Sequence, residues 1–478
     1  MDQYIERVVD LLEPAANRIY NMTVDDARRR VLSGDSGAVR EIDGSFALLA
    51  REGKTIRMAR SLDRPMRYFL AKRHQGPALI VADRIDTIYR QLKAEGLAGQ
   101  FHPSYTRMVP AHYVTEIQLV GCPDPDPSYT RFFTPHRNAL PADRDEIGLR
   151  YVGVLADEIA KWLKAIESRA GVSPAAAVVS TANGRSSQDI RGIEAREGRR
   201  DTRPTLPTAP IGVCFSGGID SGSVFLLTYH VMRKLGMSPS RLKAFTLNFG
   251  SGPDFEQARE FLDRLGLGLF LEAIEADLAS LDVAETIRVL EDYKPLDVEC
   301  ASMGLALCRG IRARYPEWKY LIDGDGGDEN LKDYPIEENP ELTIRSVVNN
   351  LMLYQEGWGV GRIKHSLTYS GGLSRSYSRT YAPARQCGFE GFSPYTGPDV
   401  VAVAEAIPFA ALTGMSVEKL YALKGEIVSR GVKAITGFDM PVFPKRRFQH
   451  GAMPREKLRL RLPEQEAIYR RQLSAIYS

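Results

Sequence analysis

The feature that most restricts the fold of this chain is an uninterrupted strand, turn and helix signal between residues 211 and 235. The run IGVCF is a short apolar segment typical of a buried parallel strand, and SVFLLTYHVMRKLG has apolar residues at helical spacing. KAFTLNFG and then FEQAREFLDRLG repeat the same order of strand and helix. This alternation predicts an α/β fold with a doubly wound parallel sheet.

The turn between the first strand and helix reads SGGIDS and has the chemistry of a phosphate site. Two glycines let the backbone fold closely around an anion, and the following helix offers free N–H groups. We expect four residues to bind pyrophosphate oxygens: Ser216, Gly217, Gly218 and Ser221. Asp220 would repel phosphate without a cation between them, so it predicts Mg²⁺. A bare SGG tripeptide is more often an ordinary turn, but the strand, the helix, Asp220 and Ser221 together favour the phosphate site.

A second loop, YLIDGDGGDEN, follows another apolar run and is both acidic and glycine-rich. Successive strand ends of a parallel sheet converge on one edge, so Asp328 is expected to meet Asp220 across a metal ion. A solvated acidic turn is the alternative. A calcium loop is disfavoured because the spacing does not match the EF-hand pattern.

The chain of 478 residues is too long for one compact core, and its pattern divides into three parts. Residues 1–142 contain short strands broken by turns and predict a β-rich α+β domain. Residues 143–210 contain a long helix and then a linker rich in Ala, Ser, Gly and Arg. Residues 211–478 contain the parallel sheet and end in a mostly helical part.

Charge and cysteine content restrict the function. A net charge of +3 offers no case for a nucleic-acid partner. The five cysteines are widely spaced and form no CxxC pair, so buried reduced thiols are expected. Without a signal peptide's apolar core or a run long enough to span a bilayer, the sequence predicts a cytoplasmic protein with no membrane partner. Homo-oligomerisation is left open.

The two loops together resemble those of the asparagine synthetase family of N-type ATP pyrophosphatases. Three further stretches resemble family segments in the same order: FTLNFGSGPDFEQAREFLDRLGL, FEGFSPYTGPDVVAVAEAIP and FPKRRFQHGA. The first half is similar, more weakly, to the family's Ntn-type glutaminase domain through REIDGSFALLAREGKTIRMARSLDRPMRYF. The resemblance implies an ATP-pyrophosphatase domain with ATP and Mg²⁺ as cofactors.

One departure concerns the glutaminase. Members that hydrolyse glutamine use a cysteine at residue one after removal of Met, whereas this chain begins Met1-Asp2 and its first cysteine is Cys122. We therefore expect a degenerate N-terminal domain without glutaminase activity, which is similar to the branch that includes β-lactam synthetases. Asp325 departs from both the tyrosine of that branch and the glutamate of asparagine synthetases.

The resemblance implies a two-step ligase. A substrate carboxylate, in a small molecule or a peptide, attacks the α-phosphate of ATP, and an amine then displaces AMP to give an amide within or between molecules. Asp220 and Asp328 would hold Mg²⁺, the Leu247 backbone would contact the adenine, and Gly324 would lie beside the α-phosphate. The remaining residues are catalytic: Glu390 with Asp325 would take the amine proton, and Lys445 would stabilise the second transition state.

Two other function classes stay open at this point. Other enzymes with a PP-loop adenylate a carbonyl oxygen and introduce sulfur into tRNA or a cofactor, and such a reaction would need a reactive thiol such as Cys214 or Cys387. A non-catalytic scaffold is the third reading. Glu390 alone could be a surface carboxylate, and Lys445 could belong to a solvated basic face.

Overall fold

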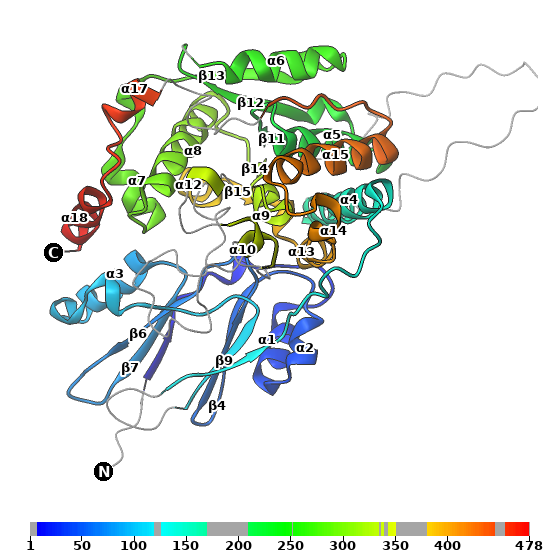
Figure 1. Cartoon of the computed structure of the whole chain (residues 1–478). Coiled ribbons are helices and arrows are strands. Elements are labelled where there is room, and N and C mark those ends of the chain that lie inside the picture. The colour runs from blue at the N-terminus through cyan, green and yellow to red at the C-terminus, as the bar shows by residue number, and fades with distance from the viewer. Residues whose placement is uncertain are drawn as a thin grey trace, which may run out of the picture.

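The computed structural model describes residues 7–118, 126–169, 209–250, 252–333, 336–338, 343–349, 380–444 and 455–477. The N-terminal part, blue to cyan in Figure 1, lies against the larger remainder, cyan-green to red. Most of the predicted linker, residues 170–208, lies outside the described residues. The mixed α/β composition expected from the sequence is confirmed.

Two four-stranded sheets and a short strand pair build the N-terminal part. Their orders are β1-β7-β6-β8, β10-β9-β5-β4 and β2-β3. The strands are β1 (Arg7–Asp10), β2 (Arg18–Ile19), β3 (Gly44–Ser45), β4 (Ala47–Glu52), β5 (Thr55–Arg60), β6 (Arg67–Ala71), β7 (Ala78–Ala82), β8 (Arg107–Met108), β9 (Tyr113–Gln118) and β10 (Ser128–Arg131). The pairing is antiparallel except between β1 and β7, which are parallel.

Strand β7 shows why this part carries a continuous apolar run. Leu79 and Val81 pack into the core between the two sheets, whereas Ile80 and Ala82 pack on the other face with α3 (Ile85–Ala94) and the second half of the chain. Both faces of the strand are therefore buried, which requires apolar residues at every position. Two further helices, α1 (Val24–Ser33) and α2 (Ser36–Arg40), cover the sheet that contains β4.

The helix predicted after residue 143 is present as α4 (Arg144–Arg169). It packs against α15 (Val417–Thr436) at a glycine contact, because a Cβ atom on Gly148 would lie 2.7 Å from the Ile427 carbonyl oxygen. The buried side chains of Tyr151 and Trp162 belong to the same core as the parallel sheet. This helix is therefore part of the core of the second half.

The second half contains five parallel strands in the order β13-β12-β11-β14-β15. They are β11 (Ile211–Cys214), β12 (Leu242–Asn248), β13 (Leu271–Glu275), β14 (Tyr320–Ile322) and β15 (Glu390–Phe392). One face packs on α4, α5 (Ile219–Lys234), α6 (Asp254–Arg264) and α15, and the other on α7 (Val283–Leu290) and α8 (Pro295–Arg314). In this order, β12 and β13 lie on one side of β11, and β14 and β15 lie on the other.

The chain continues mainly as helices, as the sequence predicts. They are α9 (Gly327–Leu331), α10 (Ile344–Asn349), α12 (Ala382–Gln386), α13 (Pro398–Glu405), α14 (Phe409–Thr413), α17 (Arg455–Arg459) and α18 (Glu466–Ile476). Beyond α18, the Tyr477 ring meets Tyr89 and Phe101 edge-on at centroid distances of 5.3 and 5.4 Å. The end of the chain thus packs on the N-terminal part.

Polar contacts also hold the two parts together. Arg18 donates to the Gly391 carbonyl oxygen at 2.6 Å and so covers the free edge of β15. Glu291 accepts hydrogen bonds from the backbone N–H groups of Ile85 and Asp86 at 2.8 and 2.9 Å, which caps α3 from the other part of the molecule. These buried contacts fix the position of the N-terminal part beside the sheet.

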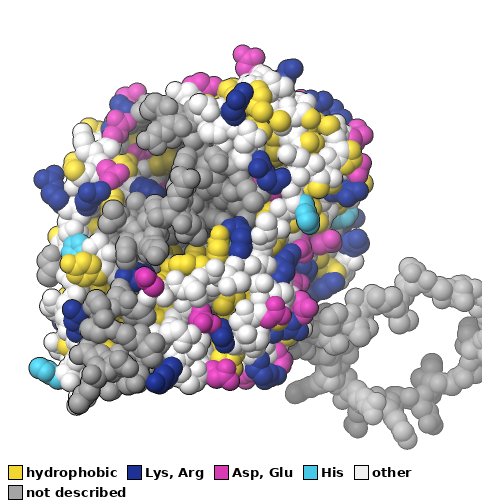
Figure 2. All heavy atoms as spheres, turned by 60° about the horizontal axis from the view of Figure 1, so that its bottom comes forward, with side chains coloured by type: hydrophobic (Ala, Val, Ile, Leu, Met, Phe, Trp, Pro, Cys, Tyr) yellow, Lys and Arg dark blue, Asp and Glu magenta, His cyan; other side chains and the backbone are white. Residues whose placement is uncertain are grey.

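The surface gives two further observations. Figure 2 shows basic and acidic side chains interspersed over the visible face, with no broad area of one sign. In the described parts of the chain, every helix is too short or too polar to cross a bilayer.

Candidate functional site

The first loop of the site connects β11 to α5, and its packing restricts which residues it can contain. Gly217 has φ +70°, and a Cβ atom there would lie 2.8 Å from Ala258 Cα, so the position suits only glycine. The Ser216 N–H donates to Ser221 Oγ at 3.1 Å, and the two serine hydroxyls are 3.2 Å apart. Hydroxyl groups and the first N–H groups of a helix of 16 residues thus gather at one point, which is the arrangement that binds anions.

The second loop connects β14 to α9 and lies directly on the first. A Cβ atom on Gly324 would be 2.7 Å from both the Asp220 carbonyl carbon and the Ser221 nitrogen. Gly326 has φ +101° and packs against Tyr395. The glycines of this loop therefore allow two strand ends to approach with their backbones in contact.

Lys424 on α15 joins the two loops. Its Nζ lies 2.6 Å from Asp220 Oδ2, contacts Asp328 Oδ1, and is 3.6 Å from Asp333 Oδ2. The lysine side chain is 3% exposed. Burial by itself would lower the pKa of Lys424, but the three carboxylates outweigh it and raise this pKa well above 10.5. The lysine is thus a buried ammonium that holds Asp220 and Asp328 together.

The sequence reasoning missed Lys424, although a signal is present. Leu420, Leu423, Ile427 and Val428 form the buried face of α15, and Lys424 lies within the same stripe. A lysine at such a position is rarely buried unless it is paired. The helical pattern could therefore have identified Lys424 as a functional candidate.

The expected meeting of Asp220 and Asp328 takes place, as contact with one shared ammonium. Among the described residues, no group of three or more His, Cys, Asp or Glu side chains is placed to hold a metal ion. Two carboxylates fit Mg²⁺, because this ion is usually held by one or two carboxylates together with substrate phosphates and water. The donor set is therefore suited to a metal that arrives with a nucleotide.

Asp323 and Asp325 lie at the carboxyl end of β14. Asp323 is 2% exposed and accepts hydrogen bonds from Ser393 Oγ at 2.7 Å and from the Asp325 N–H at 3.0 Å. Burial, and then the nearby charge of Asp325, raises the pKa of Asp323 well above 3.8. Asp323 therefore anchors the loop that presents the half-buried Asp325 beside the phosphate loop.

Glu390 lies elsewhere. It is the first residue of β15 and is in register with Tyr320, the first residue of β14, so it belongs to the amino ends of the strands. Its carboxylate pairs with Lys319 at 2.8 Å and Arg169 at 3.2 Å. Both loops follow the carboxyl ends, at the other edge of the sheet. The structure does not bring Glu390 to the other predicted residues, which corrects its expected place beside the amine.

The other predicted residues divide into two groups. Leu247 is the penultimate residue of β12, so its backbone lies near the same edge of the sheet as the loops. Lys445 lies outside the described residues, as does Cys122. Burial raises the pKa of Cys214 and of Cys387, which keeps both thiols protonated and poorly nucleophilic.

Comparisons with known proteins agree with this site. Residues 205–382 match the protein family described as Asparagine synthase. Amidase chry2 of Gibberella zeae is 33% identical and Amidase chyE of Penicillium rubens 30% identical, each over 162 residues. Each match covers 31% of this chain but only 23% of the relative, so the chain spans less than a quarter of these relatives.

A solved structure, a predicted subunit of tRNA methyltransferase from Methanocaldococcus jannaschii, is 24% identical over 29% of this chain and 62% of its own. Its TM-score of 0.17 is too low to show a shared fold. The family match includes both loops of the site. Residues 205–382 are thus similar to the asparagine synthase family, as the sequence motifs predict.

Proposed function

We propose that the protein is an ATP-dependent, AMP-forming ligase that adenylates a substrate carboxylate and joins it to an amine, without hydrolysing glutamine. The observation that carries the proposal is the convergence of Asp220 and Asp328, from two loops at one edge of a parallel sheet, on Lys424. A phosphate-binding turn and an acidic loop in contact are suited to a nucleotide whose pyrophosphate is to leave. In this proposal, residues 211–478 form a doubly wound ATP-pyrophosphatase domain, and residues 143–210 form a bridging segment before it.

The phosphate oxygens would lie on the first loop. Ser216 and Ser221 supply hydroxyl donors, Gly217 and Gly218 supply backbone N–H groups, and the N-terminus of α5 adds the positive end of its dipole. Gly324 is packed against this loop and would lie beside the α-phosphate. The Leu247 backbone would contact the adenine.

Asp220 and Asp328 would hold Mg²⁺, which neutralises charge on a leaving pyrophosphate. Lys424 supports this role because it keeps the two carboxylates close together before the nucleotide binds. The two side chains therefore need to move little when Mg²⁺ arrives with the nucleotide. The lysine also counters the excess negative charge that Asp333 adds to the cluster.

The amine must lose a proton, because an ammonium ion is not nucleophilic. Asp325 is the carboxylate that the second loop presents at the correct edge of the sheet, and we assign it the role of base. Glu390 is not retained in this role. Lys445 keeps the role that the resemblance implies, the stabilisation of negative charge during amide formation.

Residues 1–142 would be a degenerate glutaminase-like domain that serves as a scaffold, and no cysteine precedes Cys122 in it. The competing sulfur-transfer function is weakened by the raised pKa values of Cys214 and Cys387. The two relatives named amidases act, by name, on the class of bond that the proposed reaction would form.

The experiment is a screen of carboxylic acids for pyrophosphate release from Mg-ATP, followed by a screen of amines for product. AMP and pyrophosphate are the expected products. Formation of ADP and orthophosphate would show that the nucleotide is cleaved at a different bond and would refute the proposal.

A further inference from the structure

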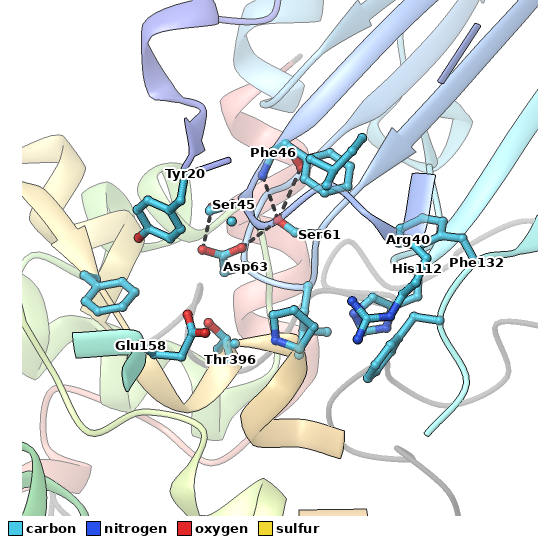
Figure 3. Close-up of a pocket in the computed structure, with 17 residues that line it drawn as sticks. Tyr20, Arg40, Ser45, Phe46, Ser61, Asp63, His112, Phe132, Glu158 and Thr396 are labelled. Atoms are coloured by element: carbon cyan, nitrogen blue, oxygen red, sulfur yellow. Dashed lines mark hydrogen bonds between the residues drawn. The ribbon is translucent and has the colours of Figure 1, made fainter. Parts of the chain in front are cut away.

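A cavity lies where the N-terminal part, α4 and the turn after β15 meet (Figure 3). Tyr20 and Asp63 line it from one side, Glu158 from α4, and Phe392 and Thr396 from the parallel-sheet part. The space open to the centres of water-sized molecules is about 30 Å³. One water needs about 10–15 Å³ on this scale, so the cavity accommodates a group of two or three heavy atoms.

Glu158 is the side chain with remaining capacity to bind a ligand. It is 4% exposed, and its Oε1 accepts a hydrogen bond from Lys161 Nζ at 2.8 Å. No group in the described parts of the chain donates a hydrogen bond to Glu158 Oε2. Figure 3 shows this carboxyl group directed toward the space that Asp63 borders. Asp63 is already satisfied, because it accepts from Ser45 Oγ at 2.6 Å, from Ser61 Oγ at 2.7 Å and from Arg18.

The charges around the cavity favour a cation. Salt bridges connect four carboxylates with three cations in the described region: Asp43, Asp63, Glu158 and Asp399 with Arg18, Arg40 and Lys161. Lys161 is shared by three of these carboxylates, Asp43, Glu158 and Asp399, so it compensates the charge of Glu158 only in part. Burial raises the pKa of Glu158, with Lys161 opposing the effect, and this agrees with a carboxylate that is incompletely compensated.

The aromatic walls are also suited to a cation. The Arg18 guanidinium lies 5.1 Å from the centre of the Phe392 ring, and that of Arg40 lies 4.9 Å from the centre of Phe133. Ring faces attract cations through their quadrupole. An alkyl stem would meet the remaining apolar surface of Tyr20 and Phe46, which also line the cavity.

We propose that this cavity binds the ammonium head of a small primary amine, with Glu158 Oε2 accepting its hydrogen bond and a stem of one or two carbons against the rings. The proposal is independent of the ligase reaction. The same turn, however, separates the cavity from the loop site: Thr396 and Gly397 line the cavity, whereas Tyr395 accepts from Asn330 Nδ2 at 2.9 Å through its carbonyl oxygen. An amine bound in the cavity would therefore be separated from the acidic loop by the turn that contains Tyr395 and Thr396.

The test measures binding of three ligands of similar size to the full-length protein: ethylammonium, ethanol and acetate. Relaxation of the ligand methyl protons in NMR reports binding directly and needs no catalytic activity. Ethylammonium should bind with a dissociation constant of about millimolar or weaker, since three heavy atoms supply little affinity. Ethanol and acetate should bind at least about tenfold more weakly, because ethanol carries no positive charge to pair with Glu158 and acetate is repelled by it.

Two variants locate the site. Glu158→Gln should weaken ethylammonium binding about tenfold or more, whereas Glu466→Gln, which removes a carboxylate from a surface pair on α18, should leave it unchanged. Equal binding of ethanol or acetate, absence of ethylammonium binding, or unchanged affinity in Glu158→Gln would overturn the proposal. If Glu158→Gln does not fold, the order of affinity of the three ligands for the unsubstituted protein tests the proposal.

Discussion

Lys424→Met tests whether the buried ammonium holds the site together. The substitution removes the positive charge from Asp220, Asp328 and Asp333 while roughly preserving side-chain volume. Removing one partner of a buried ion pair costs about 3–5 kcal/mol. Because the side chains of Asp220 and Asp328 are 22% and 28% exposed and can be hydrated in part, we expect the lower end, a loss of about 3 kcal/mol in the free energy of unfolding.

The assay is urea denaturation at neutral pH in the presence of EDTA. Lys419→Met is a matched control, because Lys419 is an exposed residue of the same helix, and its substitution should change stability by less than about 0.5 kcal/mol. In a second series with Mg²⁺ in place of EDTA, the ion should stabilise Lys424→Met more than the unsubstituted protein, since two carboxylates lose their cation. A loss below about 1 kcal/mol for Lys424→Met, or an equal loss for Lys419→Met, would refute the reasoning.

The pH dependence gives a second check on the same residue. The pKa of Lys424 is raised above 10.5 in the folded protein, so the ammonium contributes its full stability below pH 10.5 and loses it as the pH rises through the folded pKa. The difference in stability between the unsubstituted protein and Lys424→Met should therefore stay constant from about pH 7 to 9 and shrink at higher pH. A difference that shrinks between pH 7 and 9 would contradict a raised pKa.

Four further predictions concern activity, and the first three require a known substrate pair. Glu390→Gln should keep product formation within about twofold, whereas Asp325→Asn should lower it about a hundredfold, as expected for loss of a general base at the correct sheet edge. Asp220→Asn and Asp328→Asn should each abolish release of pyrophosphate with little loss of fold, measured beside circular dichroism spectra. Lys445→Ala should still bind Mg-ATP while amide formation falls about a hundredfold or more. Incubation with glutamine should release no glutamate above background.

Each of these four predictions would be contradicted by a specific result. Strong loss in Glu390→Gln would return that residue to the base role. Normal pyrophosphate release in Asp328→Asn would remove it from the metal site. Near-normal product formation by Lys445→Ala would place this lysine on a solvated face, and steady glutamate release by highly purified protein would require a glutaminase nucleophile.

The sequence alone determined the parts of the site that are local. Ser216 to Ser221 form a strand-to-helix turn whose shape depends on its own glycines, so the motif could be read before the fold was known. The meeting of Asp220 with Asp328 was predictable as well, because parallel strands place successive loops at one edge. The resemblance to the asparagine synthetase family followed from motifs of this kind, and residues 205–382 match that family.

Tertiary structure decided the rest. A motif match aligns letters but does not say at which end of a strand a side chain lies, and the register of β15 with β14 places Glu390 at the amino edge. Lys424 lies about 200 residues from Asp220 in sequence. Its role arises only because α15 packs on the sheet and places its buried face, which includes Lys424, against the two loops. The cavity beside Glu158 likewise exists only because three distant segments meet. Such sites depend on long-range packing, which local sequence patterns do not encode.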